Sequence, residues 1–171
     1  MQPTAGHQAP VRDQSEVQRF KEAMSCFPTG ATIVTTADAS GHWWGFTASS
    51  FCSVSLAPPL VLTCLAKTAQ CFPAFAAAQR WVIHFVHAGH ADLAQLFATR
   101  GADKFADAGF GVGEHGLPVL ADASVVLHCS AYAKNDGGDH SILVGRVDKT
   151  QIGRETPAVY FRRRFHALQG A

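Results

Sequence analysis

Hydrophobic positions beyond about residue 30 gather in short runs of strand-forming residues, with polar residues between the runs. The runs are separated by turn signals, among them Asp38-Ala39-Ser40-Gly41 and Asp136-Gly137-Gly138-Asp139. The predicted strands cover residues 31–37, 42–46, 51–56, 60–65, 81–86, 125–133, 141–151 and 158–161. Short strands joined by close turns favour a mainly β fold, either a barrel or a sandwich.

Three segments carry helical spacing instead. A capping-box pattern at Ser15 begins an amphipathic stretch, so a short helix is predicted to run to about Cys26. Two further helices are predicted over residues 68–78 and 91–100. Strands and helices do not alternate regularly, which argues against a doubly wound parallel sheet.

Length and composition predict one domain. The chain has 171 residues, of which 47% are hydrophobic and 16% are charged, so it differs from disordered sequences and suffices for a single core. Residues 1–14 are polar without a hydrophobic period, and we expect a flexible N-terminal tail followed by one domain over residues 15–171. A net charge of +1 gives no reason to expect nucleic acid or an anionic membrane as a partner.

The cysteines and the absence of targeting signals indicate a cytoplasmic protein. The five cysteines are odd in number and contain no C-x-x-C pair, which suits free thiols in a reducing compartment. No apolar run reaches the roughly 18 to 20 residues of a membrane span. The first residues also lack the basic and apolar regions of a signal peptide.

Segments 27–30 and 45–51 form the strongest candidate binding site. They are rich in small and hydroxyl-bearing residues, and the only charged residues from 27 to 75 are Asp38 and Lys67. Hydrogen-bond donors here must therefore be mainly backbone N–H groups and Ser/Thr hydroxyls. Such a segment is suited to a polar, flat cofactor.

The stretch Gly111-Val112-Gly113-Glu114-His115-Gly116 has the letters of a dinucleotide-binding G-x-G-x-x-G motif. That motif presents a pyrophosphate to the N-terminus of a helix that follows a strand. Here no strand-like run precedes the glycines, and Pro118 stands where the helix should begin. We therefore interpret the stretch as a surface loop, and a nicotinamide would not be held in a Rossmann domain.

His84, His87 and His90 suggest a metal site by their even spacing. On a strand, however, side chains three residues apart point to opposite faces, and no carboxylate or thiolate lies near enough in sequence to complete a tetrahedral set. We predict no metal site, with His84 facing inward and the other two histidines on a loop at the strand end.

Ser49, Asp139 and His140 supply the residue types of a hydrolase triad. Ser49 lacks the G-x-S-x-G elbow, and the adjacent Asp139 and His140 are expected to point apart, so a triad is not predicted. Residues 137–140 suit either a plain hairpin turn or a ligand contact. In the second interpretation the glycines admit a flat ring and His140 contacts a nicotinamide.

Arg162-Arg163-Arg164 leaves two interpretations open. One is a solvated edge or a dimer contact. The other is a grip on a cofactor phosphate, because guanidinium groups bind phosphate oxygens bidentately.

Taken together, these segments resemble the flavin reductase family of the FMN-binding split barrel, the small NAD(P)H:flavin oxidoreductases that serve two-component monooxygenases. The resemblance spans most of the chain and implies an antiparallel Greek-key split β-barrel with a few short flanking helices. It rests on the order and spacing of residues 20–24, 27–30, 47–51, 53–56, 58–62, 103–105, 138–140 and 157–161. Two positions depart from the family pattern: Ala57 stands where Asp is common, and His84 stands where Asn is common.

The resemblance also implies the residues of the site. Those around the flavin are Thr29, Thr32, Thr47, Ala48, Ser49, Ser50, Cys64, Leu65, Ala66, Thr68, His84, Phe85, Lys104 and Phe105. Gly138, Asp139 and His140 would face the nicotinamide, and His140 is the catalytic-site residue expected to contact it.

The implied function is reduction of FMN or FAD by NADH or NADPH, with the reduced flavin passing to a separate oxygenase and the chain working as a homodimer. Hydride transfer between two rings depends mainly on their positioning, which agrees with the absence of an evident acid–base pair. The alternative is a non-catalytic flavin- or haem-binding carrier or sensor of the same fold. Residues 138–140 favour the enzyme, because a carrier would not require them.

Overall fold

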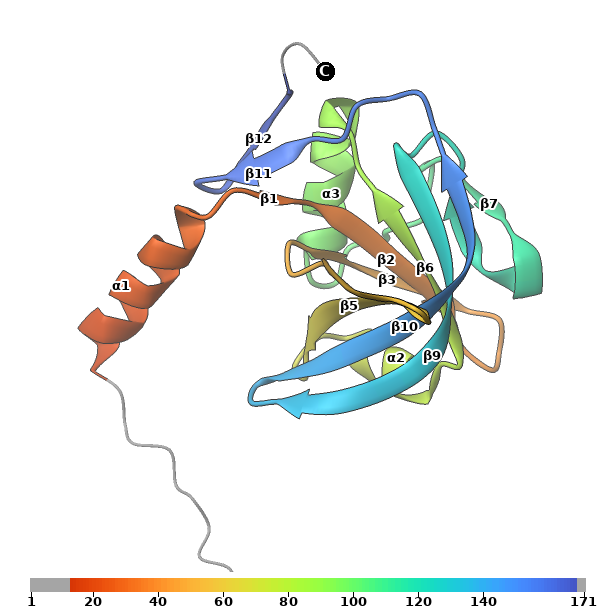
Figure 1. Cartoon of the computed structure of the whole chain (residues 1–171), viewed down its shortest axis with the longest axis horizontal. Helices are drawn as coiled ribbons and strands as arrows, with labels where there is room; N and C mark the ends of the chain where they lie inside the picture. The colour runs from red at the N-terminus through yellow and green to blue at the C-terminus, as the bar shows by residue number, and fades with distance from the viewer. Residues whose placement is uncertain (1–12, 169–171) are drawn as a thin grey trace, which may run out of the picture.

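The computed structural model describes residues 13–168, and seven of their strands form one antiparallel sheet (Figure 1). The strand order across this sheet is β3-β2-β6-β9-β10-β5-β4, and every pairing within it is antiparallel. The bounds are β2 Thr32–Ala37, β3 Trp43–Ala48, β4 Cys52–Leu56, β5 Pro59–Ala66, β6 Arg80–Phe85, β9 Val125–Gly137 and β10 His140–Ile152. The predicted mainly β antiparallel fold is confirmed.

The sheet curls so that strands from its two ends share one core. Phe46 of β3, Leu65 of β5 and Trp81 of β6 pack in the same buried cluster, together with Leu143 of β10 and Phe75. Alternation along each strand places these apolar side chains on one face, which the curl turns inward. In the described chain β3 and β4 are the edge strands of the sheet, so the barrel is not closed by hydrogen bonds on that side.

Within residues 13–168, three helices accompany the barrel: α1 Gln14–Ser25, α2 Phe72–Ala77 and α3 Ala91–Ala98, with the short 3₁₀ turns η1 Ala88–His90 and η2 Glu114–Gly116. Helix α3 covers the outer face of the sheet, where Ala94 and Phe97 pack with Ile33 and Val86. Helix α1 lies apart from the barrel and buries none of its residues (Figure 1). None of the helices in the described part of the chain combines the length and the apolar character of a membrane span.

The start of α1 differs from the prediction by a residue or two. Asp13, and not Ser15, caps the helix, because the Asp13 carboxylate accepts a hydrogen bond from the Ser15 N–H at 3.2 Å. Asp13 and Gln14 therefore belong to the start of the helix, whereas the remaining residues of the predicted tail, 1–12, lie outside the described residues.

Short strands complete the fold, and of these the sequence predicted only the one within residues 158–161. Strands β1 Thr29–Gly30, β11 Val159–Phe161 and β12 Arg164–His166 form a small sheet, while β7 Phe110–Val112 and β8 Pro118–Leu120 form a hairpin. Runs of two or three residues are too short to show a period of two. The hairpin contains the G-x-G-x-x-G letters, so the expected surface loop is a β-hairpin, and no helix of the Rossmann kind follows it.

The turn between β11 and β12 contains two of the three consecutive arginines. Arg162 and Arg163 have positive φ values of 46° and 63°. The Arg162 N–H donates to the Ser25 carbonyl at 2.8 Å, which ties this turn to the end of α1. All three arginine side chains are exposed, so the turn agrees with the edge or contact interpretation.

Candidate functional site

A cavity of about 340 Å³, which we call the edge cavity, lies beside the edge strand β3. Strand β5, the end of α3 and the start of β10 complete its walls. Seven predicted site residues line it together: the cofactor-site residues Thr47, Cys64, Leu65, Ala66, Thr68 and Lys104, and the catalytic-site residue His140. The fold therefore brings together side chains from four separate stretches of the sequence.

Two predicted hydroxyl contacts hold the cavity wall. The Thr47 hydroxyl donates to the Ala94 carbonyl at 2.5 Å and so joins β3 to α3. The Ser50 hydroxyl accepts a hydrogen bond from the Cys64 N–H at 2.9 Å, which joins the end of β3 to β5. Because β3 pairs on one side only, its outward backbone N–H and C=O groups have no strand partner and can serve a ligand.

The charged side chains of the edge cavity are cationic. Among the residues that the structure describes, no carboxylate lines it, whereas Lys104 and Arg100 do. The Lys104 ammonium donates to the carbonyls of Phe97 at 2.7 Å and Gly45 at 3.1 Å, and its partial burial lowers the pKa of Lys104. The positive charge suits an anionic ligand group such as a phosphate.

Sequence reasoning missed Arg100, Gln70 and the α3 residues Phe97 and Ala98, all of which line the edge cavity. A signal was present for Arg100, since it directly follows the predicted α3 and stands just before the Asp103-Lys104-Phe105 stretch of the resemblance. For Phe97 there was none, because its helical spacing indicated only core packing.

His140 lies at the start of β10, where it pairs with Ala66 of β5. Its Nδ1 lies 2.7 Å from the Asp139 carboxylate, and this hydrogen bond orients the ring and lowers the pKa of Asp139. The expectation that the two adjacent side chains point apart is therefore wrong. Gly138 makes the turn with a φ of 75°, and its carbonyl accepts a hydrogen bond from Lys67 at 2.6 Å.

His84 does not line the edge cavity. Its side chain is 0% exposed, its Nδ1 lies 2.9 Å from the Ile33 carbonyl oxygen, and its ring meets the edge of Phe110 with centroids 5.5 Å apart. Burial lowers the pKa of His84 to about 4, so the ring is neutral and Nδ1 is the donor to the carbonyl. This side chain offers no surface to a flavin in the cavity.

Other predicted residues do not line the edge cavity. Thr32 is buried and donates to the Ala48 carbonyl at 3.0 Å, and Ala48 is itself buried. Phe85 packs edge-on against Phe51. Thr29 lies in β1, where it pairs with β11.

Three more of the predicted residues are also outside the lining of the edge cavity. Ser49 lines a smaller cavity of about 160 Å³ that also contacts Thr47. Phe105 lines a larger neighbouring cavity, and the exposed Gly138 precedes Asp139 and His140 in the turn. Because Ser49 and His140 line different cavities, they do not form a hydrolase triad with Asp139.

The fold supplies a carboxylate near two of the evenly spaced histidines. His87, His90 and Asp122 each place one possible ligand atom within 4.8 Å of the others. Asp122 is far away in sequence, so spacing alone could not reveal it. His90 Nε2 lies 3.3 Å from an Asp122 carboxylate oxygen. His84 is not part of the group.

Comparisons with known proteins identify the family of this chain. The model of the flavin reductase like domain matches residues 24–169. The NADH:riboflavin 5'-phosphate oxidoreductase of Streptomyces pristinaespiralis is 37% identical over 164 residues, which cover 94% of this chain and 93% of the relative. The actinorhodin polyketide dimerase of Streptomyces coelicolor is 43% identical over 153 residues, covering 89% and 86% of the two chains. Further relatives are named as reductase components of monooxygenases.

A solved structure confirms the fold. The NADH:FAD oxidoreductase of Streptomyces globisporus, in complex with NAD and FAD fragments, superposes with a TM-score of 0.85 at 31% identity, covering 95% of this chain and 98% of that one. The split-barrel fold and the resemblance that implied it are thus confirmed. The chain belongs to the flavin reductase family.

Proposed function

We propose that the edge cavity binds FMN or FAD and that the chain reduces this flavin with NADH or NADPH. The observation that carries the proposal is one cavity that combines small and apolar walls, two cationic side chains and His140, with no carboxylate. Its volume of about 340 Å³ lies within the range of about 300–1,000 Å³ that is typical of small-molecule sites.

The lining residues fit a flavin in both shape and charge. Ala66, Ala69 and Ala98 are small and leave room for a flat ring, while Lys104 and Arg100 provide positive charge for its phosphate. The unpaired backbone edge of β3 provides hydrogen-bonding groups for the polar rim of the ring. When bound, the flavin supplies the ring that accepts a hydride from the nicotinamide.

His140 is proposed to orient the nicotinamide. Its ring is held by Asp139 at the cavity mouth, and its side chain is 43% exposed, so it can contact a second ring. Positioning of two rings can supply much of the rate, because well-oriented reactants avoid the entropic cost of encounter. A strong acid is not needed in such a site.

The reduced flavin is proposed to leave for a separate oxygenase. Relatives named as reductase components of monooxygenases support this partner. The edge cavity is open to solvent, which leaves a path for the reduced flavin to dissociate.

A homodimer is part of the same proposal. Helix α1 leaves Phe20 and Met24 more than half exposed, and Phe27 beyond its end is 68% exposed. Apolar side chains gathered on one projecting element are typical of an interface. Sedimentation should give a dimer for the wild type and a monomer for Phe20→Asp/Met24→Asp, and a wild-type monomer would contradict this part.

The cysteines support the proposed location in the cytoplasm. All five are free in the structure. Burial raises the pKa of the Cys71 thiol and raises that of Cys129 to about 12, so these two are unreactive.

The activity is tested by mixing the purified protein with FMN or FAD and with NADH or NADPH, and following the loss of nicotinamide absorbance. Consumption above the non-enzymatic rate is expected for at least one of the four pairs. No consumption above that rate, with flavin still bound, would favour the carrier alternative.

The role of His140 is tested by His140→Ala. We expect the KM for the nicotinamide to rise several-fold more than the KM for the flavin, because the ring contacts the reductant. His166→Ala, an exposed histidine in β12, is the matched control and should change neither value. Equal increases in both KM values would count against this role.

A further inference from the structure

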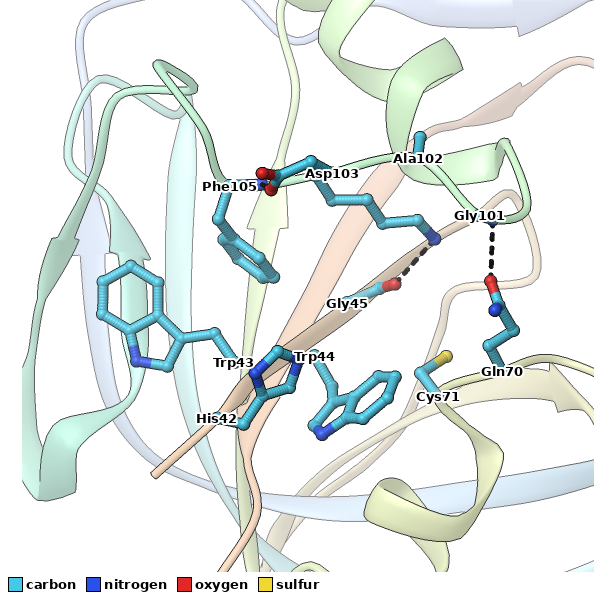
Figure 2. A pocket seen from close by; sticks show the side chains of 11 residues that line it. His42, Trp43, Trp44, Gly45, Gln70, Cys71, Gly101, Ala102, Asp103 and Phe105 are labelled. Atoms are coloured by element: carbon cyan, nitrogen blue, oxygen red, sulfur yellow. Dashed lines mark hydrogen bonds between the residues drawn. The ribbon is translucent and has the colours of Figure 1, made fainter. Parts of the chain in front are cut away.

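A second and larger cavity, which we call the aromatic cavity, adjoins the edge cavity. Its volume is about 500 Å³, and it lies between the start of β3 and the segment 101–105 (Figure 2). The two cavities share Gln70, Cys71 and Lys104 as lining residues. Lys104 thus stands at a common wall, with one cavity on each side.

Three aromatic side chains from consecutive positions face the aromatic cavity. Figure 2 shows His42, Trp43 and Trp44 opposite the segment that carries Asp103 and Phe105. The Trp44 indole N–H donates to the Asp38 carboxylate at 2.8 Å, and its ring meets His42 edge-on with centroids 4.8 Å apart.

Trp43 is held in the same manner. Its indole N–H donates to the Gly116 carbonyl at 3.1 Å, and its ring packs edge-on against Phe105. Both indole N–H groups are therefore satisfied within the protein, and both rings are only partly buried. Two fixed aromatic rings at the wall of a cavity form a stacking platform for a flat heterocycle.

Polar groups of the aromatic cavity match a nucleoside. The Asp103 carboxylate accepts only long hydrogen bonds, from the N–H groups of Ala106 at 3.3 Å and Phe105 at 3.4 Å, and retains capacity for hydroxyl or amino donors. The Gln70 side-chain oxygen accepts from the Gly101 N–H at 2.7 Å, which leaves its amide N–H groups as donors at the common wall.

The order of these features along the two cavities is a flat site, a cationic wall and a second flat site. A flavin ring in the edge cavity would direct its phosphate to Lys104 and Arg100. Beyond Lys104, the aromatic cavity offers stacking faces and the Asp103 carboxylate. A dinucleotide has this same order of flat ring, phosphates and flat ring with sugar hydroxyls.

We propose that the aromatic cavity binds the adenosine phosphate end of FAD, so that the protein prefers FAD to FMN. The inference rests on the proposed flavin site and extends it. NADH also carries an adenosine phosphate, but His140, the proposed nicotinamide contact, lines only the edge cavity, whereas Lys104 joins the two cavities. FAD is therefore the dinucleotide that the arrangement favours.

The test compares the Kd of FMN and FAD by flavin fluorescence for the wild type, Trp43→Leu and Trp44→Leu. The wild type is expected to bind FAD more tightly than FMN. Each variant should raise the Kd of FAD by between about 5-fold and about 150-fold, the range expected for loss of one stacked base. The Kd of FMN should stay unchanged. Adenosine monophosphate should compete with FAD and leave FMN binding unaffected.

Controls separate stacking from folding. Trp44 also holds the turn at Asp38, so each variant is first checked by urea unfolding, and Trp44→Phe should keep most of the FAD preference because it retains an aromatic face. Tyr132→Ala removes an exposed aromatic ring outside both cavities and should leave both affinities unchanged.

The possible outcomes discriminate between the claims. Equal affinity of the wild type for FMN and FAD, or equal weakening of both by the tryptophan variants, overturns the inference and leaves the flavin site standing. The tryptophan variants could instead raise the KM for NADH, measured with FMN as acceptor, without losing affinity for FAD. The aromatic cavity would then bind the adenosine of NADH, and this result also overturns the inference. Failure to bind either flavin contradicts the proposed function itself.

Discussion

Strands β6 and β3 show how differently the two sides of the barrel are built. β6 pairs on both edges, with β2 and β9, and its residues 81–84 are fully buried. β3 pairs only with β2, and its free edge borders both the edge cavity and the aromatic cavity. The closed side satisfies its backbone within the sheet and fills its space with side chains, whereas the open side keeps unpaired backbone and empty volume next to positive charge.

This difference means that stability and ligand binding depend on separate residues. Substitutions on the β6 side should change the free energy of unfolding, and substitutions at the β3 edge should change affinity. Lys104 contributes to both stability and binding, because it donates hydrogen bonds to two carbonyls at the cavity wall. Its substitution should therefore change the free energy of unfolding and the affinity together.

The largest effect is expected on the closed side, from Trp81→Ala. Trp81 is 0% exposed in the main core, so the free energy of unfolding should fall by about 3–5 kcal/mol through lost burial and the cavity left behind. Urea unfolding measures this loss. Val112→Ala, at a position 77% exposed, is the control and should change stability by no more than about 0.5 kcal/mol.

The next effect belongs to the open side. Lys104→Met should raise the Kd of the flavin by about 10-fold to 150-fold, since hydrogen bonds to charged groups contribute about 1.5–3 kcal/mol. Some stability should be lost as well, because Lys104 bonds the carbonyls of Gly45 and Phe97.

Arg100→Gln tests the contribution of positive charge to flavin binding separately from its contribution to stability. Arg100 is exposed at the end of α3, so its substitution should weaken flavin binding with stability unchanged. Arg154→Gln, an exposed arginine outside the edge cavity, is the matched control. Unchanged affinity in both Lys104→Met and Arg100→Gln would remove the basis for placing a phosphate at this wall.

The free energy of unfolding should depend on pH through His84, a buried residue of β6 on the closed side. The pKa of His84 is lowered by burial from 6.5 to about 4, so at intermediate pH the unfolded chain binds a proton that the folded chain does not. Stability is therefore complete above about pH 6.5 and falls as the pH approaches 4, by about 2 kcal/mol between pH 7.5 and pH 5 for this group.

His84→Asn should flatten this dependence, as measured by urea unfolding at several pH values. Part of the slope should remain, because burial also lowers the pKa of His90 and of His128. His166→Asn should leave the slope unchanged. If the stability of His84→Asn depends on pH as steeply as that of the wild type, His84 is not the buried, neutral group described above.

The smallest effect is expected from the hydrogen bond that links the segment after β3 to β5. Ser50→Ala removes the acceptor of the Cys64 N–H, so we expect a loss of about 1 kcal/mol in stability and a modest increase in the Kd of the flavin. An affinity loss as large as that of Lys104→Met would instead mean that the hydroxyl binds the flavin directly.

The sequence predicted the strands well where a strand-like run extends over five or more residues, as in β2 and β10. It missed β1, β7, β8 and β12, because two or three residues carry no period. Charge and spacing alone did not locate the cavity, since its walls combine the free edge of β3 with distant segments that only the curl of the sheet brings together.

Within the candidate site, the sequence identified the types of residue better than it identified which way their side chains point. Thr47, Ala66 and Lys104 do line the edge cavity, while His84 turns to the opposite face of β6 and becomes part of the packing. Arg100 was missed because a cation at the end of an amphipathic helix is usually only solvated. Which of these residues touch a bound flavin stays a prediction for the variants above.

The central claim, that the edge cavity is where the flavin binds, is tested most directly by Ala98→Trp. Ala98 lines this cavity from the exposed end of α3, so an indole there should fill it without disturbing the core. We expect flavin binding and NADH oxidation to be lost together, with the free energy of unfolding unchanged within about 0.5 kcal/mol. Ala77→Trp, an exposed position in α2 outside the cavity, should behave as the wild type. Wild-type flavin affinity in Ala98→Trp would contradict the account.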